Sequence, residues 1–194
     1  MFLEPHFKSQ RSGWIEVICG SMFSGKTEEL IRRLKRAVYA NQTVTTFKPM
    51  LDTRYAADDV VSHDANKMTA IAVSNAQDII ELAHHAQVVG IDEAQFFDAA
   101  LPEVCQQLAL GGKRVIIAGL DMDYKGVPFG PMPNLLAVAE YITKVHAICQ
   151  RCGNLATHSY RLVDNDTRVM LGEKESYEPR CRACYNMGNI LDLR

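Results

Sequence analysis

Residues 14–27 form the stretch WIEVICGSMFSGKT, which decides the fold. Its first part is an apolar run that stops at Gly20, as expected for a buried strand that enters a turn. Its second part, GSMFSGKT, matches the pattern G-x-x-x-x-G-K-[ST] at every fixed position. Glycines in this pattern let successive backbone N–H groups face a phosphate, and the following helix adds its positive N-terminal end. We therefore predict a nucleotide-binding loop between a strand and a helix.

The helix after this loop is indicated by apolar residues spaced for one helical face. They are Leu30, Ile31, Leu34 and Val38. Four basic residues surround this stripe on the other sides: Arg32, Arg33, Lys35 and Arg36. Charged residues on the far side of an amphipathic helix usually face water. We expect a solvated face and assign these four residues no role.

Strands and helices alternate along the next hundred residues or so of the chain. We expect strands at 43–48, 69–73, 87–92 and 114–120, and helices at 76–85 and 99–110. Such alternation predicts an α/β fold in which helices cover both faces of a parallel sheet. The long connections at 49–67 and 121–133 are expected to be loops, and long loops often carry function.

The character of the sequence changes after Tyr141. Helical periodicity ends there, and short strand-like segments surround the turn signal Asp164-Asn165-Asp166. We therefore expect two domains, with a nucleotide-binding α/β domain at residues 1–145 and a small domain at residues 146–194.

A second acidic motif, VVGIDE, ends an expected strand with Asp92 and Glu93. A nucleotide-binding sheet carries its Mg²⁺-associated acid at such a strand end, and we assign that role to Asp92. Thr27 is expected to offer its hydroxyl to the same Mg²⁺, and Lys26 to contact the β- and γ-phosphates. Glu93 would then lie near the γ-phosphate, where a carboxylate can accept the proton of an attacking hydroxyl.

Four of the six cysteines form two C-x-x-C pairs, Cys149 with Cys152 and Cys181 with Cys184. Four thiolates suit tetrahedral Zn²⁺, and a closed set of four leaves no position for a reacting water. We therefore predict a structural zinc site in a ribbon-like lid. The other two, Cys19 and Cys105, lie in apolar patterns and are expected to be buried thiols.

Composition and charge exclude several classes of protein. The chain has 194 residues, of which 47% are hydrophobic and 23% charged, a balance that excludes a fully disordered chain. Its longest uncharged apolar run, at 115–120, is too short to cross a bilayer. A net charge of −2 offers no broad positive field for nucleic acid. The first thirteen residues lack the apolar block of a secretory signal, so we expect a cytoplasmic protein.

The motifs together resemble the cytoplasmic (type II) thymidine kinases. The resemblance rests on GSMFSGKTEELIRR, IDEAQFF, AGLDMDYKGVPFG and the two cysteine pairs in this order, over residues 14–185. It implies that ATP phosphorylates the 5′-hydroxyl of thymidine, with Mg²⁺ for catalysis and Zn²⁺ in the lid. It also implies a homotetramer that binds these small molecules but neither nucleic acid nor a membrane.

The resemblance also implies a role for individual residues. Glu93 matches the general base, and Lys26 and Arg54 match the other catalytic groups. The residues expected to contact ATP or its Mg²⁺ are Gly20, Ser21, Met22, Phe23, Ser24, Gly25, Lys26, Thr27, Asp52, Asp92, Glu93, Ala94 and Gln95. Those expected to contact thymidine are Met22, Phe96, Leu120, Tyr124, Phe129, Ser159, Met170, Gly172 and Tyr177.

One residue departs from the family pattern, since a threonine usually stands at the position of Ser159. A lost methyl group changes apolar contact by at most ~0.8 kcal/mol, so preference would be relaxed but not redirected. Two other functions fit parts of the sequence. One is a nucleic-acid-stimulated ATPase whose zinc ribbon binds DNA, which the mixed charge of residues 146–194 disfavours. The other is a nucleotide switch without turnover, which Glu93 disfavours.

Overall fold

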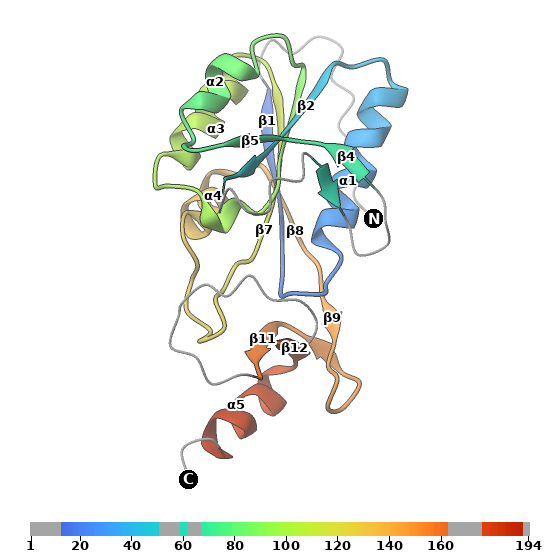
Figure 1. The fold of residues 1–194 in the computed structure, drawn as a ribbon, viewed down its shortest axis with the longest axis vertical. Helices are drawn as coiled ribbons and strands as arrows, with labels where there is room; N and C mark the ends of the chain where they lie inside the picture. Colours follow the sequence, from blue (N-terminus) through green and yellow to red (C-terminus); the bar gives the residue numbers. More distant parts are fainter. Residues whose placement is uncertain (1–12, 51–58, 62–66, 163–175, 192–194) are drawn as a thin grey trace.

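The computed structural model describes residues 13–50, 59–61, 67–162 and 176–191. These residues form a larger part built on a central sheet, and a smaller part with β9 to β12 and α5 that lies beyond one end of that sheet (Figure 1). None of the helices in this described portion has the length and apolar character needed to cross a membrane.

The larger part contains one sheet of six strands in the order β5-β2-β6-β7-β1-β8. Its strands are β1 (Trp14–Cys19), β2 (Val44–Pro49), β5 (Ile71–Val73), β6 (Val88–Ile91), β7 (Arg114–Gly119) and β8 (Tyr141–Lys144). Every strand runs parallel to its neighbours, so the predicted parallel α/β sheet is confirmed. Because β6, β7 and β1 lie side by side, the segments that follow them meet at one edge of the sheet.

Helices cover both faces of this sheet (Figure 1). On one face lies α1 (Lys26–Tyr39), and on the other lie α2 (Asp78–Leu82), α3 (Leu101–Leu110) and α4 (Met132–Val138). Successive side chains of a strand point to opposite faces. Ile15 and Val17 therefore join the apolar cluster of α2, α3 and α4, whereas Ile18 joins that of Leu30 and Leu34 on α1.

The basic residues of α1 are not all solvated, and the expectation for Arg33 is wrong. Its side chain is fully buried and forms ion pairs with Glu16 of β1 at 2.9 Å and with Glu29 at 2.8 Å. Glu16 also pairs with Arg114 of β7 at 2.7 Å. The carboxylate of Glu16 is buried on the face of β1 that α1 covers. It needs buried cations as partners, because an unpaired buried charge is very costly. Arg32 does face water, as expected.

The apolar stripe of α1 also differs from prediction at one position. Leu30, Ile31 and Leu34 are buried, but Val38 is 49% exposed. Ala37 takes the buried place instead. Both predicted core thiols, Cys19 and Cys105, are buried, and burial is the largest reason that the pKa of each is raised.

Several local elements of the larger part differ from prediction, and one of them is β8, which pairs with β1 but was not predicted. Residues 69–73 do not form one strand, because β4 (Lys67–Thr69) pairs antiparallel with β3 (Asp59–Val61) and only β5 joins the large sheet. The helix expected at 76–85 shrinks to α2. Helix α4 begins inside the loop expected at 121–133. Pro131 and Pro133 fit its first turn, but seven residues are too few to give a periodic pattern.

The smaller part contains two antiparallel pairs and one helix. The pairs are β9 (Ala147–Ile148) with β10 (Leu155–Ala156), and β11 (His158–Arg161) with β12 (Tyr177–Arg180). The helix α5 (Arg182–Leu191) corrects the expectation that helices end before Tyr141. The division into domains at 1–145 and 146–194 stays a prediction, and the turn signal at 164–166 lies outside the described residues.

Candidate active site

The loop at residues 20–25 joins β1 to α1 at the edge where the strands of the sheet end. Gly20 (φ 148°) and Gly25 (φ 85°) adopt backbone angles that favour glycine. A side chain at Gly20 would meet the carbonyl oxygen of Val145 at 2.2 Å, so the close approach of these two segments requires glycine there. Phe23 has φ 61° despite its side chain, a strained conformation of the kind that gathers at functional sites.

Lys26 points back into this loop. Its ammonium Nζ donates a hydrogen bond to the carbonyl oxygen of Ser21 at 2.8 Å. Ser24 Oγ donates to the same oxygen at 2.7 Å. Burial lowers the pKa of Lys26, while the nearby carboxylates of Glu93 and Asp92 oppose that shift. The loop thus holds one buried cation close to two acids, and a polyphosphate chain brings the anionic oxygens that such a cation binds.

Asp92 and Thr27 meet where β6 ends and α1 begins. The Thr27 hydroxyl lies 3.2 Å from Asp92 Oδ2, and Asp92 is only 6% exposed. Burial, followed by the charge of Glu93, raises the pKa of Asp92 to about 7. A hydroxyl beside a buried carboxylate is the ligand set expected for Mg²⁺ next to a nucleotide, so these two residues fit that ion.

Glu93 follows directly but has a different backbone conformation. Its φ of 52° and ψ of 39° are left-handed, and the short 3₁₀ helix η2 (Ala94–Phe96) begins after it. Its carboxylate accepts a hydrogen bond from Gln95 Nε2, and its backbone N–H donates to Asp92 Oδ1 at 2.9 Å. The two adjacent carboxylates therefore have different partners.

The residues expected around thymine lie in several segments. Phe96 of η2 and Phe129 form an edge-to-face pair with ring centres 5.4 Å apart. Tyr124 lies under the guanidinium of Arg161, whose Cζ is 3.6 Å from the ring centre. The same guanidinium donates to the hydroxyl of Tyr177 at 2.8 Å. Tyr177 is buried on β12.

The smaller part also contacts the phosphate loop directly. The backbone N–H of Met22 donates to Ser159 Oγ of β11 at 3.0 Å. Phe23 packs against the apolar cluster of Ala147, Cys149 and Ala156. The structure therefore brings together the loop residues, Asp92 and Ser159. Four other candidates, Asp52, Arg54, Met170 and Gly172, lie outside the described residues.

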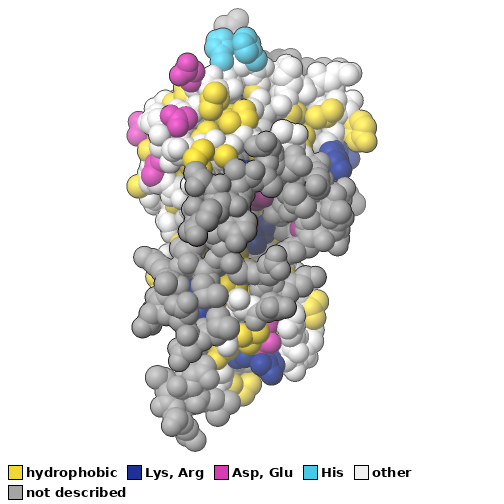
Figure 2. All heavy atoms as spheres, in the orientation of Figure 1, with side chains coloured by type: hydrophobic (Ala, Val, Ile, Leu, Met, Phe, Trp, Pro, Cys, Tyr) yellow, Lys and Arg dark blue, Asp and Glu magenta, His cyan; other side chains and the backbone are white. Residues whose placement is uncertain are grey.

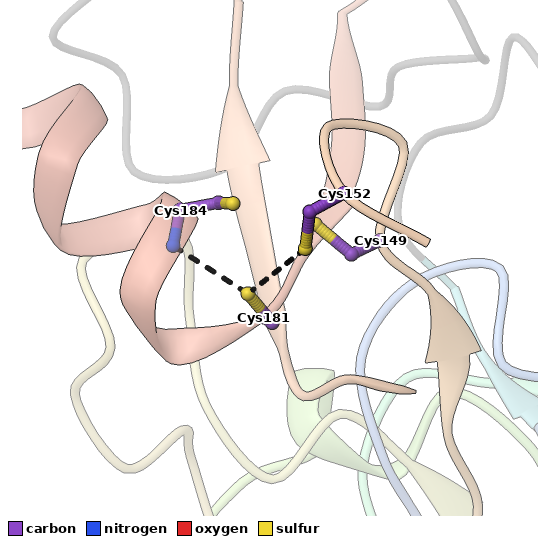
Figure 3. Close-up of side chains that lie close together, drawn as sticks. All are labelled: Cys149, Cys152, Cys181 and Cys184. Carbon is purple, nitrogen blue, oxygen red and sulfur yellow. Dashed lines mark hydrogen bonds between the residues drawn. The ribbon is translucent and has the colours of Figure 1, made fainter. Parts of the chain in front are cut away.

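The four paired cysteines converge on one point (Figure 3). Their sulfur atoms all lie within 4.8 Å of one another. Cys152 Sγ is 3.6 Å from Cys181 Sγ, and the backbone N–H of Cys184 approaches Cys181 Sγ at 3.5 Å. Four sulfurs in such a cluster fit the donor set of tetrahedral Zn²⁺.

The thiols of this cluster differ in acidity. Burial raises the pKa of Cys149, but hydrogen bonds from the backbone of Cys181, Arg151 and Cys152 outweigh it and lower the pKa to about 6. Hydrogen bonds with Cys152 and Cys181 raise the pKa of Cys184 to about 12. Neighbouring thiolates repel one another, so a cation that neutralises them is required before all four can ionise together.

Several residues near the candidate site were not predicted from the sequence. Asp121 is the second residue after β7 and pairs with Lys144 of β8 at 2.6 Å, so the pair spans the end of β1. The rule that found Asp92, a carboxylate at the end of a buried strand, would also have found Asp121. Arg161 lies two residues after Ser159 and shares its strand face, which was an available signal. Tyr185 donates to the carbonyl oxygen of Tyr124 at 2.7 Å, and no sequence pattern points to it.

The glycine loop between β1 and α1 and the acid at the end of β6 define a phosphate-loop nucleotide-binding protein. Within that large class, the thymidine kinase family model matches residues 13–185. The chain therefore belongs to the thymidine kinase family, and the resemblance seen in the sequence is confirmed.

Individual relatives agree with this assignment over most of their length. The thymidine kinase of Bacteroides fragilis (strain YCH46) is 60% identical over 186 residues, which cover 95% of this chain and 94% of that protein. The thymidine kinase of Rhodothermus sp. (strain ITI 518) is 63% identical over 173 residues, covering 89% and 81%. That of Porphyromonas gingivalis (strain ATCC 33277) is 60% identical over 180 residues, covering 93% and 88%.

Proposed function

We propose that this chain transfers the γ-phosphoryl group of ATP to the 5′-hydroxyl of thymidine and so forms thymidine monophosphate. The observation that carries this proposal is the contact of Thr27 with Asp92 beside the glycine loop, in a chain of the thymidine kinase family. Glu93 stands next to this pair and supplies the group that a kinase needs to accept a proton.

ATP binding is assigned to the loop and to the end of β6. Gly20, Ser21, Met22, Phe23, Ser24 and Gly25 would surround the phosphates, mainly through backbone N–H groups other than that of Met22, which donates to Ser159. Lys26 would neutralise the charge that develops on the γ-phosphoryl oxygens. Thr27 and Asp92 would hold Mg²⁺, which would supply positive charge beside the phosphates. Ala94 and Gln95, together with Asp52, complete the set of residues assigned to this side of the site.

Thymidine binding is assigned to residues from the phosphate loop, from the segments after β6 and β7, and from the smaller part. Met22, Phe96, Leu120, Tyr124, Phe129, Ser159, Met170, Gly172 and Tyr177 form the proposed contact set. Planar apolar side chains offer the surface that a base stacks against, and backbone groups give the few fixed hydrogen bonds. Glu93 would accept the 5′-hydroxyl proton, and Arg54 would stabilise charge near the reacting groups.

Zn²⁺ is assigned to Cys149, Cys152, Cys181 and Cys184. Four protein ligands fill its tetrahedral shell, so its role would be to order the lid that carries Ser159 and Tyr177. We also infer a homotetramer and a cytoplasmic location from the family resemblance. Light scattering after size-exclusion chromatography measures the first of these.

A nucleic-acid-stimulated ATPase is not favoured. On the face drawn in Figure 2, acidic and basic side chains of the described residues are interspersed and form no single basic band. Arg151 and Arg180 are paired with Glu178, and Arg161 is stacked on Tyr124. These arginines are engaged within the protein, whereas nucleic-acid binding needs cations presented to a phosphate backbone.

Labelled ATP, Mg²⁺ and each of the four deoxynucleosides provide the direct test. We expect label transfer to thymidine in preference to the three others, at a rate that single-stranded DNA does not change. Release of inorganic phosphate that depends on added DNA, with no labelled nucleotide product, would contradict the proposal.

A further inference from the structure

We propose that Gln95 is a positioning residue that fixes the carboxylate of Glu93 and links it to the segment that follows β7. This inference rests on the proposed function, because it explains how the residue assigned as the base is held.

The side-chain amide of Gln95 makes two hydrogen bonds in opposite directions. Its Nε2 donates to Glu93 Oε2 at 2.5 Å, and its Oε1 accepts from the backbone N–H of Leu120 at 2.9 Å. Gln95 is only 2% exposed. A buried amide with both ends paired is rigid, because breaking either bond would leave an unsatisfied polar group away from water.

These partners also determine which way the amide faces. The backbone N–H of Leu120 can only donate, so it requires the carbonyl oxygen of Gln95. The NH₂ group must then face the carboxylate of Glu93. A reversed amide would place two donors together on one side and two acceptors on the other. The N–H of Leu120 therefore fixes the orientation of the Gln95 amide, and in this orientation the NH₂ group donates to Glu93.

The backbone around Glu93 makes this support necessary. Glu93 is one of three described non-glycine residues with positive φ, a strained conformation that persists only where surrounding contacts hold it. The described residues provide one side-chain hydrogen bond to this carboxylate, from Gln95 to Oε2. That bond fixes one oxygen and leaves Oε1 as the atom to accept a proton.

Two glycines leave the space that Gln95 occupies. A Cβ at Gly130 would lie 2.2 Å from the backbone oxygen of Gln95. A Cβ at Gly119 would lie 3.0 Å from its side-chain Oε1 and closer still to the sulfur of Met132. The end of β7 therefore packs closely against the side chain of Gln95, and Gly130 packs against its backbone, as expected for a site that must be held in place.

The amide of Gln95 connects Glu93 to the proposed thymidine site. Leu120 begins the segment that carries Tyr124 and Phe129, which are proposed to contact the base of thymidine. A change in that segment on substrate binding would reach Glu93 through a single amide. Correct placement of a catalytic group contributes to rate and not to substrate affinity, so the effect of Gln95 should fall on kcat.

Two substitutions at Gln95 separate its two hydrogen bonds. Gln95→Glu keeps an oxygen for the N–H of Leu120 but replaces the donor to Glu93. We expect kcat to fall by about 10- to 100-fold, with KM for thymidine and ATP changed by less than about threefold. Gln95→Met has a similar size and loses both bonds, so it should also raise KM for thymidine. Gln106→Glu makes the same charge change on an exposed position of α3 and serves as the control.

A double-variant cycle distinguishes positioning from a general structural role. If Gln95 acts through Glu93, then Gln95→Glu should lower kcat much less in a Glu93→Gln background than in the native enzyme. Thermal melting of each variant gives the folded fraction to which kcat is referred. Additive effects on kcat, or native kcat in Gln95→Glu, would overturn the positioning role while leaving the proposed reaction intact. A fully active Glu93→Gln would instead remove the base assignment itself.

Discussion

At the end of β6 two carboxylates follow one another, and the backbone between them sends them to different partners. Asp92 lies beside Thr27, buried at the start of α1. Glu93 turns through a left-handed conformation and is held by Gln95. Neighbouring acids in one sequence motif can therefore serve as a metal-associated group and as a base, because their local conformations differ.

The base assignment predicts a specific kinetic defect. Glu93→Gln keeps the shape of the side chain but cannot accept a proton, so kcat should fall by about 10² to 10⁴. A loose phosphoryl-transfer transition state favours the lower end of this range. Dissociation constants for thymidine and ATP should change little, since the interaction is made mainly in the transition state. Undiminished kcat would exclude the base role, and lost thymidine affinity would make Glu93 a substrate-positioning group.

Ser159 joins the smaller part to the phosphate loop through its hydroxyl. Ser159→Ala leaves the N–H of Met22 without this acceptor, at a cost of about 1 kcal/mol, so affinity for thymidine should fall severalfold. Ser159→Thr keeps a hydroxyl and should retain near-native affinity, which explains how the family threonine and this serine can both serve. Calorimetric titration of thymidine measures both variants. Equal affinity in the alanine variant and the native protein would contradict a role for this contact.

Among the elements, β1 and α1 are joined by charge as well as by apolar packing. Glu16 and Arg33 are both fully buried, and removing either one deprives the other of one of its two ionic partners. Glu16→Gln or Arg33→Met should lower the free energy of unfolding by about 1.5 to 3 kcal/mol, the range for a lost hydrogen bond to a charged group. Arg32→Met, at a position half exposed on the same helix, should cost about 0.5 kcal/mol or less. Urea denaturation compares the three, and equal losses would contradict the buried pair as the cause.

The strand pair β11–β12 contains Glu178, whose ionised carboxylate stabilises the smaller part. Burial raises the pKa of Glu178, but hydrogen bonds from Arg180 and Arg151 outweigh it and hold the pKa below its ordinary value of 4.5. A lowered pKa in the folded state means that the stabilising contribution is complete above about pH 5 and is lost as the pH falls through the folded value.

Glu178→Gln should therefore melt at a lower temperature than the native protein at neutral pH, and the difference should shrink in acid. Thermal melting of both proteins from about pH 3 to about pH 7 measures this difference in melting temperature. The range includes the ordinary pKa of a carboxyl group. A difference that stays constant across the range would show that the charge of Glu178 is not its cause.

Most elements of the large sheet were predictable because each has a strong local pattern. The strands β1, β6 and β7 are mostly apolar, apart from Glu16 and Arg114, as expected where a parallel sheet is buried on both faces. Helix α4 was not predictable, because seven residues do not give a periodic signal. The burial of Arg33 was not predictable for a different reason. Its burial depends on Glu16 seventeen positions earlier, and no local pattern pairs the two.

At the scale of the whole molecule, the candidate site joins segments that are far apart in the chain. The motifs for ATP were found from sequence because each is a continuous stretch with fixed spacing. The contact of Met22 with Ser159 spans 137 positions, and that of Tyr185 with Tyr124 spans 61. Such pairs form only when the smaller part packs against the end of the sheet. Sequence motifs could therefore indicate single residues such as Ser159, but not which residue each of them contacts.

We propose that the α/β part binds ATP by itself, whereas thymidine binding also needs the smaller part, which carries Ser159 and Tyr177. Calorimetric titration of each substrate into native and metal-stripped protein tests this proposal most directly, with Cys152→Ser as a second way to open the cysteine cluster. The four cysteines belong to the smaller part, whereas Lys26 and Thr27 lie on α1 and Asp92 follows β6. Opening the cluster should therefore abolish thymidine binding while much of the ATP affinity remains. Loss of ATP binding with thymidine binding retained would contradict the proposal.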